Sequence, residues 1–552
     1  MNFKGREYKL SVILPWIAAV IKDYKLKLIL CVVLGWAIVG LNFVFVWLTK
    51  IAIDSATGDK NHNVIVAALA GLALTIAIQA LISAVSRRLR TMTSFRMNRR
   101  LQERLFEKAV YARWPEINKY HTGDITRRLE EDGAEIISFV SSTIPTILLV
   151  LLQLLGAYIF LIILSYKIAI VLAIIMVVGV FISKFHFLKI RAFSAKIKEG
   201  GSMLQAALQE GLQNISVLKA LAGNRLFMRY YSHIFGLQED NVRRRLSYTV
   251  LSSTILNVGF AACYLFVFVW GVFGLESSSI TYGTLIAFVQ LVGQIQGPSR
   301  TLISSISDFA EFYTSCERLN EISSIKQEHV IEPSAISLTT TPGIICRDLS
   351  YSYTQGGRKI LDHFNCEFAP KSFNAIIGTT GAGKTTLIRL LLSYIEPDEG
   401  EIFLFIDGRK ERVGINTRSA FAYVPQGNSL FSMSLRDNLR LSNPQATDYE
   451  MKRVLSLSCA DFIMKHKEGL DTMCGENGRG FSQGQAQRFC IARALLSKAP
   501  VLLFDEATSA LDHGTEELII KNIKAEIRDK TILFITHRDA VMKYADKVIR
   551  VN

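Results

Sequence analysis

The sequence lacks the features that stabilise small secreted or zinc-binding proteins. Its 552 residues include eight cysteines, which are scattered without close pairs or nearby histidine clusters. Disulfide frameworks and zinc sites both need characteristic cysteine spacings, so neither is indicated. Reduced, structural thiols are the expected state of these side chains.

Charged residues are missing from six long stretches. No Asp, Glu, Lys or Arg occurs within residues 28–48, 63–86, 136–166, 168–183, 246–275 and 277–299. A helix needs about 20 predominantly apolar residues to cross the hydrocarbon core of a bilayer, and the fourth stretch reaches that length if its helix continues to residue 190. We therefore expect a multi-pass integral membrane protein with six transmembrane helices, at about 28–48, 63–86, 136–166, 168–190, 246–275 and 277–299.

The chain carries 63 Lys and Arg against 48 Asp and Glu, a net charge of +15. Taken alone, this excess is compatible with a nucleic-acid partner. The positions of these residues instead indicate how the chain is oriented in the membrane. Residues 87–135 and 184–245 are rich in Lys and Arg, whereas the only basic residues of the opposite loops are Lys50, Lys60 and Lys167. Positive loops stay on the cytoplasmic side of a membrane, so both termini are predicted to be cytoplasmic and no nucleic-acid partner is expected.

Changes in pattern divide the chain into four parts. Residues 1–27 include an apolar stretch of about twelve residues at 10–21, too short to span and predicted to form an interfacial elbow helix. Residues 28–322 form the transmembrane domain, with long helical extensions in the cytoplasm, and residues 323–342 read as a linker. Residues 343–552 alternate short β-rich runs with helical ones. The predicted strands lie at 344–353, 373–378, 421–426, 501–505, 531–536 and 547–551.

The last domain contains a P-loop in its required context. The sequence GTTGAGKT, residues 378–385, follows a β-rich run and precedes a helical one. Glycines let backbone N–H groups close around phosphates, and the helix N-terminus adds its positive dipole end. Lys384 is expected to neutralise the β/γ oxygens, and the Thr385 hydroxyl is expected to hold Mg²⁺. The fold class is therefore a membrane α-helical bundle plus an α/β P-loop NTPase domain that binds ATP and Mg²⁺.

An acidic pair completes this half of the site. Four apolar residues at 501–504 lead to Asp505 and Glu506. A buried strand would deliver Asp505 to the metal, and Glu506 lies where it can polarise an attacking water. Such a pair is weak evidence for a nucleotide site by itself, and it becomes strong evidence in a chain that also has a P-loop.

Further motifs carry a family resemblance. The sequence GFSQGQAQR, residues 480–488, resembles the signature motif of ATP-binding-cassette (ABC) proteins. Gln426 looks like that family's Q-loop glutamine, residues 509–512 like its D-loop, and His537 like its switch histidine. In the membrane half, residues 120–124 and 210–215 resemble the coupling regions of ABC exporters. The helical extensions are expected to reverse near residues 120–124 and near residues 210–216.

The resemblance implies roles for individual residues. Glu506, His537, Gln426 and Lys384 are the expected catalytic residues, and Tyr353 is placed like the aromatic residue that stacks on adenine, with Tyr351 as the alternative. The expected nucleotide contacts are Tyr353, Gly378, Thr379, Thr380, Gly381, Ala382, Gly383, Lys384, Thr385, Thr386, Phe481, Ser482, Gln483, Gly484, Gln485 and Asp512. The expected metal ligands are Thr385, Gln426 and Asp505.

Two positions depart from the family pattern. The signature has Gln483 where Gly is most frequent and Phe481 where Leu is most frequent. Ser482 and Gly484, which contact the γ-phosphate in the family, remain, so we expect ATP to be sandwiched normally.

The resemblance also implies a dimer, because in ABC proteins the signature of one subunit completes the P-loop site of another. We expect a half-size exporter that acts as a homodimer in lipid, a heterodimer being the less favoured alternative. A bacterial inner or plasma membrane is the expected location, with the nucleotide domain cytoplasmic. Intact Glu506 and His537 disfavour a nucleotide-gated channel or regulatory subunit, and fusion of both domains disfavours an uptake system with an obligatory binding protein.

The substrate is less well specified. No charge lies in the middle of any span, which favours an amphipathic or lipid-like substrate over a small, highly charged one. Several amides do lie in the spans, namely Asn42, Gln79, Gln153, Asn257, Gln290, Gln294 and Gln296. They either line a substrate cavity or simply hydrogen-bond between helices, and the second interpretation is favoured.

Overall fold

The computed structural model of the protein describes residues 18–58, 61–120, 122–328, 340–354, 357–379, 381–406, 408–475 and 480–551. The chain divides into two compact units. The membrane unit comprises Met1–Lys108 and His121–Ser324, and the nucleotide unit comprises Ala109–Tyr120 and Ile325–Asn552. Most of the expected elbow helix lies outside the described residues, as do His121 and Thr380.

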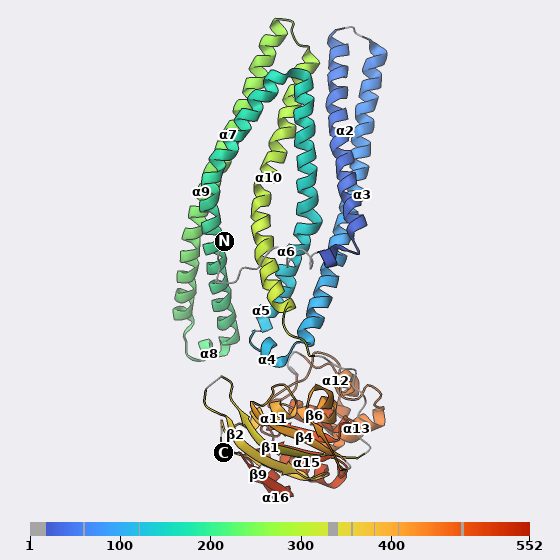
Figure 1. The fold of residues 1–552 in the computed structure, drawn as a ribbon, viewed down its shortest axis with the longest axis vertical. Coiled ribbons are helices and arrows are strands. Elements are labelled where there is room, and N and C mark those ends of the chain that lie inside the picture. Colours follow the sequence, from blue (N-terminus) through green and yellow to red (C-terminus); the bar gives the residue numbers. More distant parts are fainter. Residues whose placement is uncertain are drawn as a thin grey trace. The chain divides into compact units, whose positions relative to one another are not determined.

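Long helices build the membrane unit (Figure 1). They are α2 (Lys25–Thr57), α3 (His62–Val110), α7 (Ile144–Gln213), α9 (Asn224–Glu276) and α10 (Tyr282–Ser323). Short elements connect them: α5 (Thr122–Arg127), the π-helical η1 (Arg128–Asp132), α6 (Gly133–Ser138), the π-helical η2 (Phe139–Thr143) and α8 (Ile215–Ala220). The second reversal falls between α7 and α8, within the expected residues 210–216. The first begins earlier than expected, because α3 already ends at Val110.

Four described helices are long and apolar enough to cross a membrane: Lys25–Thr57, His62–Val110, Thr122–Ile170 and Asn224–Glu276. The expected boundary between the third and fourth spans coincides with a backbone break, since Ser165 has non-helical dihedrals within α7. Side chains of residues 171–188 lie outside the description. The expected sixth span falls in α10, where Gln290, Gln294 and Gln296 reduce the apolar character. The count of six spans therefore stays a prediction.

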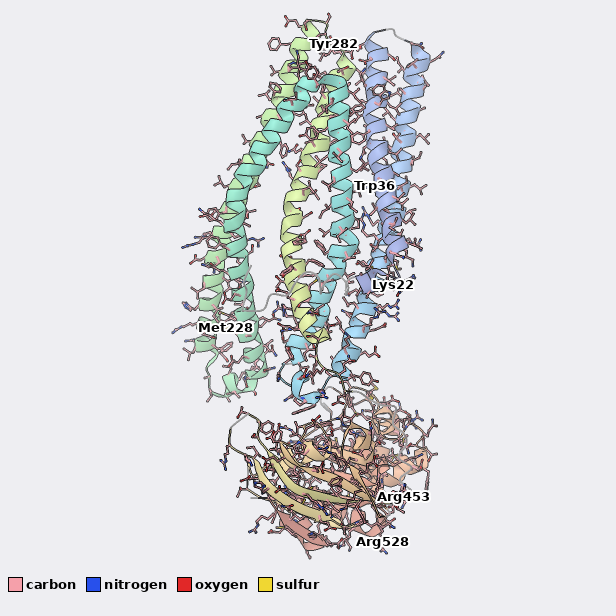
Figure 2. The ribbon with its side chains drawn as sticks, in the orientation of Figure 1. Lys22, Trp36, Met228, Tyr282, Arg453 and Arg528 are labelled. Atoms are coloured by element: carbon pink, nitrogen blue, oxygen red, sulfur yellow. The ribbon has the colours of Figure 1, made fainter. Side chains whose placement is uncertain are left out.

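Two pairs of amides in the spans bond across helices, whereas Asn257 accepts from Arg300 and the buried Gln290 Oε1 has no hydrogen-bond partner among the described residues. Gln79 on α3 donates from Nε2 to Asn42 Oδ1 on α2 at 3.1 Å, and Gln153 on α7 donates to Gln294 on α10. Apolar side chains point outward from the same helices, as at Trp36, which is 44% exposed (Figure 2). The interhelical interpretation of these amides fits this arrangement, because a polar group in hydrocarbon needs a partner.

The nucleotide unit contains two sheets. A parallel sheet has the order β6-β7-β8-β3-β9, and an antiparallel one has the order β2-β1-β4-β5. The parallel strands are β3 (Phe373–Ile377), β6 (Phe421–Val424), β7 (Val501–Asp505), β8 (Thr531–Ile535) and β9 (Lys547–Arg550). The antiparallel strands are β1 (Gly343–Tyr351), β2 (Leu361–Phe368), β4 (Glu399–Ile406) and β5 (Arg409–Arg412). Two apolar clusters cover the parallel sheet. One includes residues of α14 (Gln483–Leu496) and α15 (His513–Glu526), and the other includes residues of α11 (Lys384–Leu391) and of the antiparallel sheet.

Each of the six predicted runs contains a strand, but the six strands do not form one sheet. β1 lies in the antiparallel sheet and not in the parallel one, and β2, β4 and β5 were not predicted. β2 and β5 carry charged or polar residues at many positions and have no continuous apolar run, whereas β4 has an apolar run at residues 402–406 and was missed nonetheless. By contrast, every residue of β7 and β8 is buried, as is typical of parallel strands covered on both faces.

The helices of the nucleotide unit are short. They are α4 (Trp114–Ile117), α11 (Lys384–Leu391), α12 (Leu435–Arg440), α13 (Asp448–Leu457), α14 (Gln483–Leu496), α15 (His513–Glu526) and α16 (Asp539–Tyr544). Single 3₁₀ turns lie at η3 (Ile415–Ala420), η4 (Asp461–Lys465) and η5 (Gly469–Asp471). α4 comes from the stretch between α3 and α5, so the sequence connecting two membrane helices contributes to this unit.

Strand register determines which motifs meet. Asp505 of β7 pairs with Ile535 of β8, and Ile535 pairs in turn with Ile376 of β3. The carboxyl ends of parallel strands lie at one edge of a sheet, where ligands bind in open α/β folds. Glu506, His537 and the P-loop therefore emerge side by side at that edge.

Candidate nucleotide site

The P-loop connects β3 to α11. Gly383, at the N-cap of α11, has φ +96°, and Gly381 has φ +86°. Residues with a Cβ rarely adopt this left-handed backbone conformation, which glycine tolerates. A Cβ at Gly383 would also lie 3.0–3.1 Å from Ile360 and Leu361. The loop therefore needs glycine here to present its N–H groups to a phosphate.

Lys384 is buried and lies along the loop. Its Nζ donates to the carbonyl oxygens of Gly378 at 2.7 Å and Thr379 at 3.0 Å. It also lies 2.9 Å from His537 Nε2. Lys384 must exchange these neutral acceptors for phosphate oxygens when it binds nucleotide. The exchange is favourable because hydrogen bonds to charged groups are the stronger ones.

Glu506 lies between Gln426 and His537, two of the other residues expected to be catalytic. Its Oε2 accepts a hydrogen bond from Gln426 Nε2 at 2.7 Å, and its Oε1 lies 3.6 Å from His537 Nε2. Its φ of +47° is left-handed, a strained conformation for this residue type that clusters at functional sites. The Glu506 N–H donates to the Ile535 carbonyl at 3.1 Å, which holds the turn.

Asp505 is buried one residue earlier. Burial raises its pKa, and the Tyr423 hydroxyl, which donates to Oδ2 at 3.3 Å, lowers it less. Burial also raises the pKa of Tyr423, and the charge of Asp505 adds to that rise. A buried carboxylate with few partners is suited to a cation, which would stabilise its ionised form. Thr385, the residue after Lys384, is exposed and carries a hydroxyl of the type that binds Mg²⁺.

The two tyrosines considered for base stacking differ in exposure. Tyr351 packs against the apolar cluster of the antiparallel sheet, whereas Tyr353 is 50% exposed. The Tyr353 hydroxyl accepts a hydrogen bond from Arg389 at 2.7 Å and lies 3.3 Å from Thr386 Oγ1. Exposure therefore favours Tyr353 as the stacking residue.

The signature residues form the start of α14. Ser482 is the N-cap and accepts from the Gln485 N–H at 3.2 Å, while the Gln485 side chain accepts from the Ser482 N–H at 2.9 Å. Phe481 packs edge-on against Phe489, with ring centroids 5.0 Å apart, so the aromatic departure from the family pattern is accommodated by the core. Gln483 is exposed.

Gly484 permits close approach to the D-loop. A Cβ at this position would lie 2.9 Å from the Ala510 carbonyl oxygen. Asp512 caps α15 by accepting from the Thr515 N–H at 3.0 Å and the Thr515 hydroxyl at 2.7 Å, and these bonds lower its pKa. Within the described residues, the hydrogen bonds of the Ser482, Gln485 and Asp512 side chains given above join them to residues of α14 and α15 and not to the P-loop.

Two residues that the sequence analysis did not select hold the D-loop. Buried Gln487 accepts from the Ala510 N–H at 3.0 Å and donates to Ser509 Oγ at 3.1 Å. Arg538, next to His537, donates to the Ser509 carbonyl at 2.7 Å. Gln487 lies inside the signature motif and Arg538 beside the switch histidine, but sequence alone does not reveal these partners.

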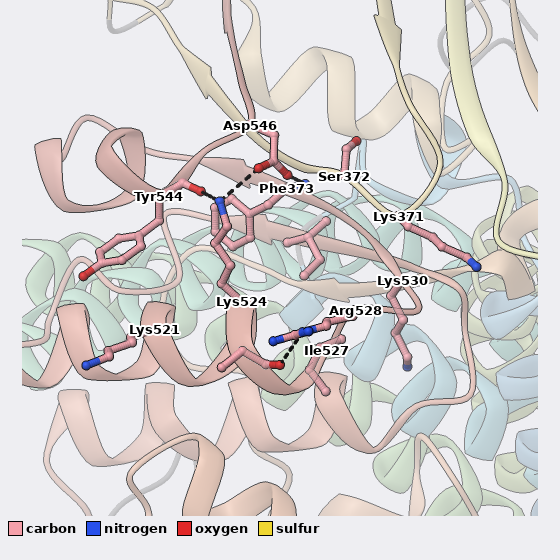
Figure 3. A pocket seen from close by; sticks show the side chains of 12 residues that line it. Lys371, Ser372, Phe373, Lys521, Lys524, Ile527, Arg528, Lys530, Tyr544 and Asp546 are labelled. Carbon is pink, nitrogen blue, oxygen red and sulfur yellow. Dashed lines mark hydrogen bonds and ion pairs between the residues drawn. The ribbon is translucent and has the colours of Figure 1, made fainter.

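Surface hollows occur at both ends of the parallel sheet. One of about 430 Å³ is lined by Gly378, Thr379 and His537 at the carboxyl end. Another of about 540 Å³ lies at the amino ends of β3 and β8 (Figure 3). The amino groups of Lys371, Lys521 and Lys530 point away from one another there, so this basic hollow offers no converging anion site.

The structure thus separates the selected residues into two groups. Lys384, Gln426, Asp505, Glu506 and His537 lie together at the carboxyl edge of the parallel sheet, with Tyr353 linked to α11. Phe481, Ser482, Gln483, Gly484, Gln485 and Asp512 belong to the α14 and D-loop group. Thr380 lies outside the described residues.

Comparison with known families identifies both units. The ABC transporter transmembrane region family matches residues 28–299, and the ABC transporter family matches residues 361–509. An ATP-dependent lipid A-core flippase of Desulfotalea psychrophila is 32% identical over 447 residues, which cover 78% of this chain and 75% of the relative. The chain belongs to the ABC transporter family. The resemblance found in the sequence is confirmed, and with it the fused membrane and ATP-binding domains.

Other relatives match this ABC protein over shorter lengths. The leukotoxin export ATP-binding protein LtxB of Aggregatibacter actinomycetemcomitans is 34% identical over 277 residues, which cover 50% of this chain and 39% of the relative. The chain thus spans less than half the length of that relative. A solved structure of a bacterial Atm1-family ABC exporter with ATP bound has a TM-score of 0.81 at 23% identity, covering 97% of this chain and 94% of the other. That likeness establishes the fold.

Proposed function

We propose that this ABC protein hydrolyses ATP to drive export or flipping of a substrate across a membrane. The cluster formed by Glu506, Gln426 and His537 carries the proposal, because it holds a carboxylate beside a P-loop in a hydrogen-bonded, strained conformation. A channel or regulatory subunit does not require such a cluster. ATP-driven pumping does.

Each residue of the cluster has a chemical task. Lys384 and the loop N–H groups bind the β- and γ-phosphates, and Glu506 accepts a proton from the attacking water. Gln426 orients Glu506 through its 2.7 Å hydrogen bond. His537, 3.6 Å from Glu506, is placed to contact the transferred phosphoryl group. Thr385, Asp505 and Gln426 are the residues that would hold Mg²⁺, which would neutralise charge at the phosphates when bound.

The site is completed by a second subunit. Within the described residues, the Ser482 side chain bonds to Gln485 and not to the P-loop, although the family resemblance assigns Ser482 and Gly484 to the γ-phosphate. A second copy of this chain supplies them from across a homodimer, and a heterodimer remains the alternative. ATP binding then favours one packing of the helix bundle, and hydrolysis restores the other.

The substrate is amphipathic or lipid-like. The amides in the spans pair with one another at Gln79–Asn42 and Gln153–Gln294, and the spans hold no central charge. This interior suits a substrate with a large apolar part. The lipid A-core flippase relative supports the same class, and the leukotoxin export relative makes a peptide the competing class. The protein resides in a bacterial inner membrane, with the nucleotide unit in the cytoplasm.

Reconstitution in lipid vesicles tests this function. ATPase activity of wild type is compared with that of Glu506→Gln while lipids, drugs and peptides are added in turn. We expect vanadate-sensitive hydrolysis that is lost in the variant and rises with amphipathic lipids. Hydrolysis no faster in wild type than in the variant under every condition would exclude an active homodimeric pump, and stimulation by peptides alone would exclude the lipid-like substrate.

A further inference from the structure

Arg389 on α11 lies between two features that have different roles. Its guanidinium donates to the Tyr353 hydroxyl at 2.7 Å. The carbon of the same guanidinium lies over the indole ring of Trp114, 4.8 Å from the ring centroid. Tyr353 belongs to the proposed base site, and Trp114 begins α4, the segment that the stretch between membrane helices α3 and α5 contributes to the nucleotide unit.

Trp114 is fixed in this unit by further stacking. Its ring is parallel to that of Tyr394, with an interplanar angle of 12° and centroids 5.9 Å apart. Tyr394 carries a second guanidinium, that of Arg418, 5.1 Å from its centroid. Arg418 forms a two-bond ion pair with Glu328 at 2.6 and 3.1 Å. Trp114 therefore moves only if this stack rearranges.

The backbone around Trp114 is hydrogen-bonded to residues 326–328, which follow α10. The Arg113 N–H donates to the Lys326 carbonyl at 3.0 Å, and the Glu328 N–H donates to the Tyr111 carbonyl at 2.8 Å. The Glu116 carboxylate accepts from the Lys326 N–H at 3.1 Å. A change at Trp114 thus acts on chain segments continuous with both α3 and α10.

The geometry of a guanidinium explains why one residue can serve both contacts. Its edge carries N–H donors while its face stacks on an aromatic ring. Arg389 uses the edge for Tyr353 and the face for Trp114. The charge also lowers the pKa of Asp505, although burial, the larger effect, raises it. Lysine has no planar face with donors at its edge and cannot reproduce this pair of contacts.

We propose that Arg389 couples occupation of the base site at Tyr353 to the position of Trp114 in α4. A base stacked on Tyr353 fixes the ring and its hydroxyl, which fixes the Arg389 edge and thereby the face on which Trp114 lies. Arg389 is a positioning residue, and its role rests on the proposed ATPase function. A phosphate ligand that binds at the P-loop without a base on Tyr353 is not expected to move Trp114 through Arg389.

Fluorescence of Trp114 in the full-length chain tests the proposal. The other four tryptophans are removed by Trp16→Phe, Trp36→Phe, Trp47→Phe and Trp270→Phe. ATP and inorganic tripolyphosphate are added in turn without Mg²⁺, so that binding is observed without hydrolysis. We expect ATP to change the Trp114 emission and tripolyphosphate to leave it unchanged. An equal response to both would overturn the proposal.

Two variants locate the path. Tyr353→Phe keeps the ring for stacking and removes the hydroxyl, and Arg389→Lys keeps the charge and removes the planar fork. Arg389→Lys is expected to bind ATP in calorimetry with loss of the Trp114 response, and Tyr353→Phe is expected to lose that response even when saturated with ATP. Arg412→Lys, at an exposed arginine paired with Glu401, retains the response. A response that survives in Tyr353→Phe and Arg389→Lys would contradict the coupling role.

Two further readings separate this proposal from the proposed function. If the variant that lacks the other four tryptophans does not fold, the Trp114 signal is obtained as the difference in emission between wild type and Trp114→Phe. If ATP is bound and hydrolysed by wild type while Trp114 gives no response, only the coupling role fails. If calorimetry detects no ATP binding, the proposed function and the coupling role both fail.

Discussion

Polar side chains are used differently in the two units. In the nucleotide unit, Lys384 and Asp505 are buried and have either neutral partners or few partners. In the membrane unit, Gln153 and Gln294 bond to each other across helices. Polar groups that pair fully stabilise a structure, whereas those left with exchangeable partners remain available to a ligand. In the nucleotide unit these buried groups are thus available to a ligand, whereas in the membrane unit Gln153 and Gln294 satisfy each other.

The largest expected effect concerns the P-loop lysine. Lys384→Ala should weaken ATP binding by roughly 10- to 100-fold, since a hydrogen bond to a charged group contributes about 1.5–3 kcal/mol. Calorimetry in detergent measures the affinity. The matched control is Lys521→Ala, which removes the same charge from the basic hollow at the other end of the sheet. If both variants bind ATP as wild type does, the P-loop lysine does not differ from a surface lysine.

Asp505 gives the next effect, through pH. Burial raises its pKa in the folded protein, so folding favours its neutral form and the ionised form reduces stability at neutral pH. In thermal unfolding without nucleotide or Mg²⁺, Asp505→Asn should therefore be several degrees more stable than wild type near pH 7. The gain should shrink as the pH falls toward about 4, the ordinary pKa of aspartic acid.

Asp512 serves as the control of opposite sign. Its hydrogen bonds to Thr515 lower its pKa, so folding favours its charged form. Asp512→Asn should lose stability near neutral pH, and its difference from wild type should vanish as the pH falls through its own depressed pKa. Equal pH profiles for the two variants would show that burial does not distinguish these carboxylates.

Helix caps provide the same device in both units. Ser482 caps α14 in the nucleotide unit, and Thr281 caps α10 in the membrane unit by accepting from the Thr284 N–H. Each change to alanine should cost about 1 kcal/mol of stability, measured as a shift in thermal unfolding. Ser482→Ala alone should also reduce ATP hydrolysis. A similar loss of hydrolysis in Thr281→Ala would mean that the signature serine acts only as a cap.

The smallest expected effect concerns the membrane amides. A double-mutant cycle of Gln153→Leu and Gln294→Leu should give a coupling free energy of about 0.6–1.7 kcal/mol, as for interhelical hydrogen bonds in membranes. Unfolding in mixed micelles measures it. A coupling near zero, together with altered substrate-stimulated ATPase activity, would place these amides in a substrate cavity instead.

Much of the nucleotide site could be predicted because its motifs are contiguous. The P-loop, the acidic pair at 505–506 and the signature are short, and each requires a particular strand, loop or helix. By contrast, β2, β4 and β5 were missed, because β2 and β5 have no apolar run and the three strands are held in the sheet by pairing, β2 and β4 with β1 and β5 with β4. The expected spans agree with four apolar helices, but the amide-rich start of α10 reduces the signal there.

The sequence by itself determined the family, the P-loop chemistry and the long apolar helices, since these follow from local motifs and from runs without charge. Only the tertiary structure joined Arg389 to both Tyr353 and Trp114, and Gln487 and Arg538 to the D-loop. Those contacts connect residues from distant parts of the chain, and their partners depend on strand register and helix packing. No local pattern encodes them.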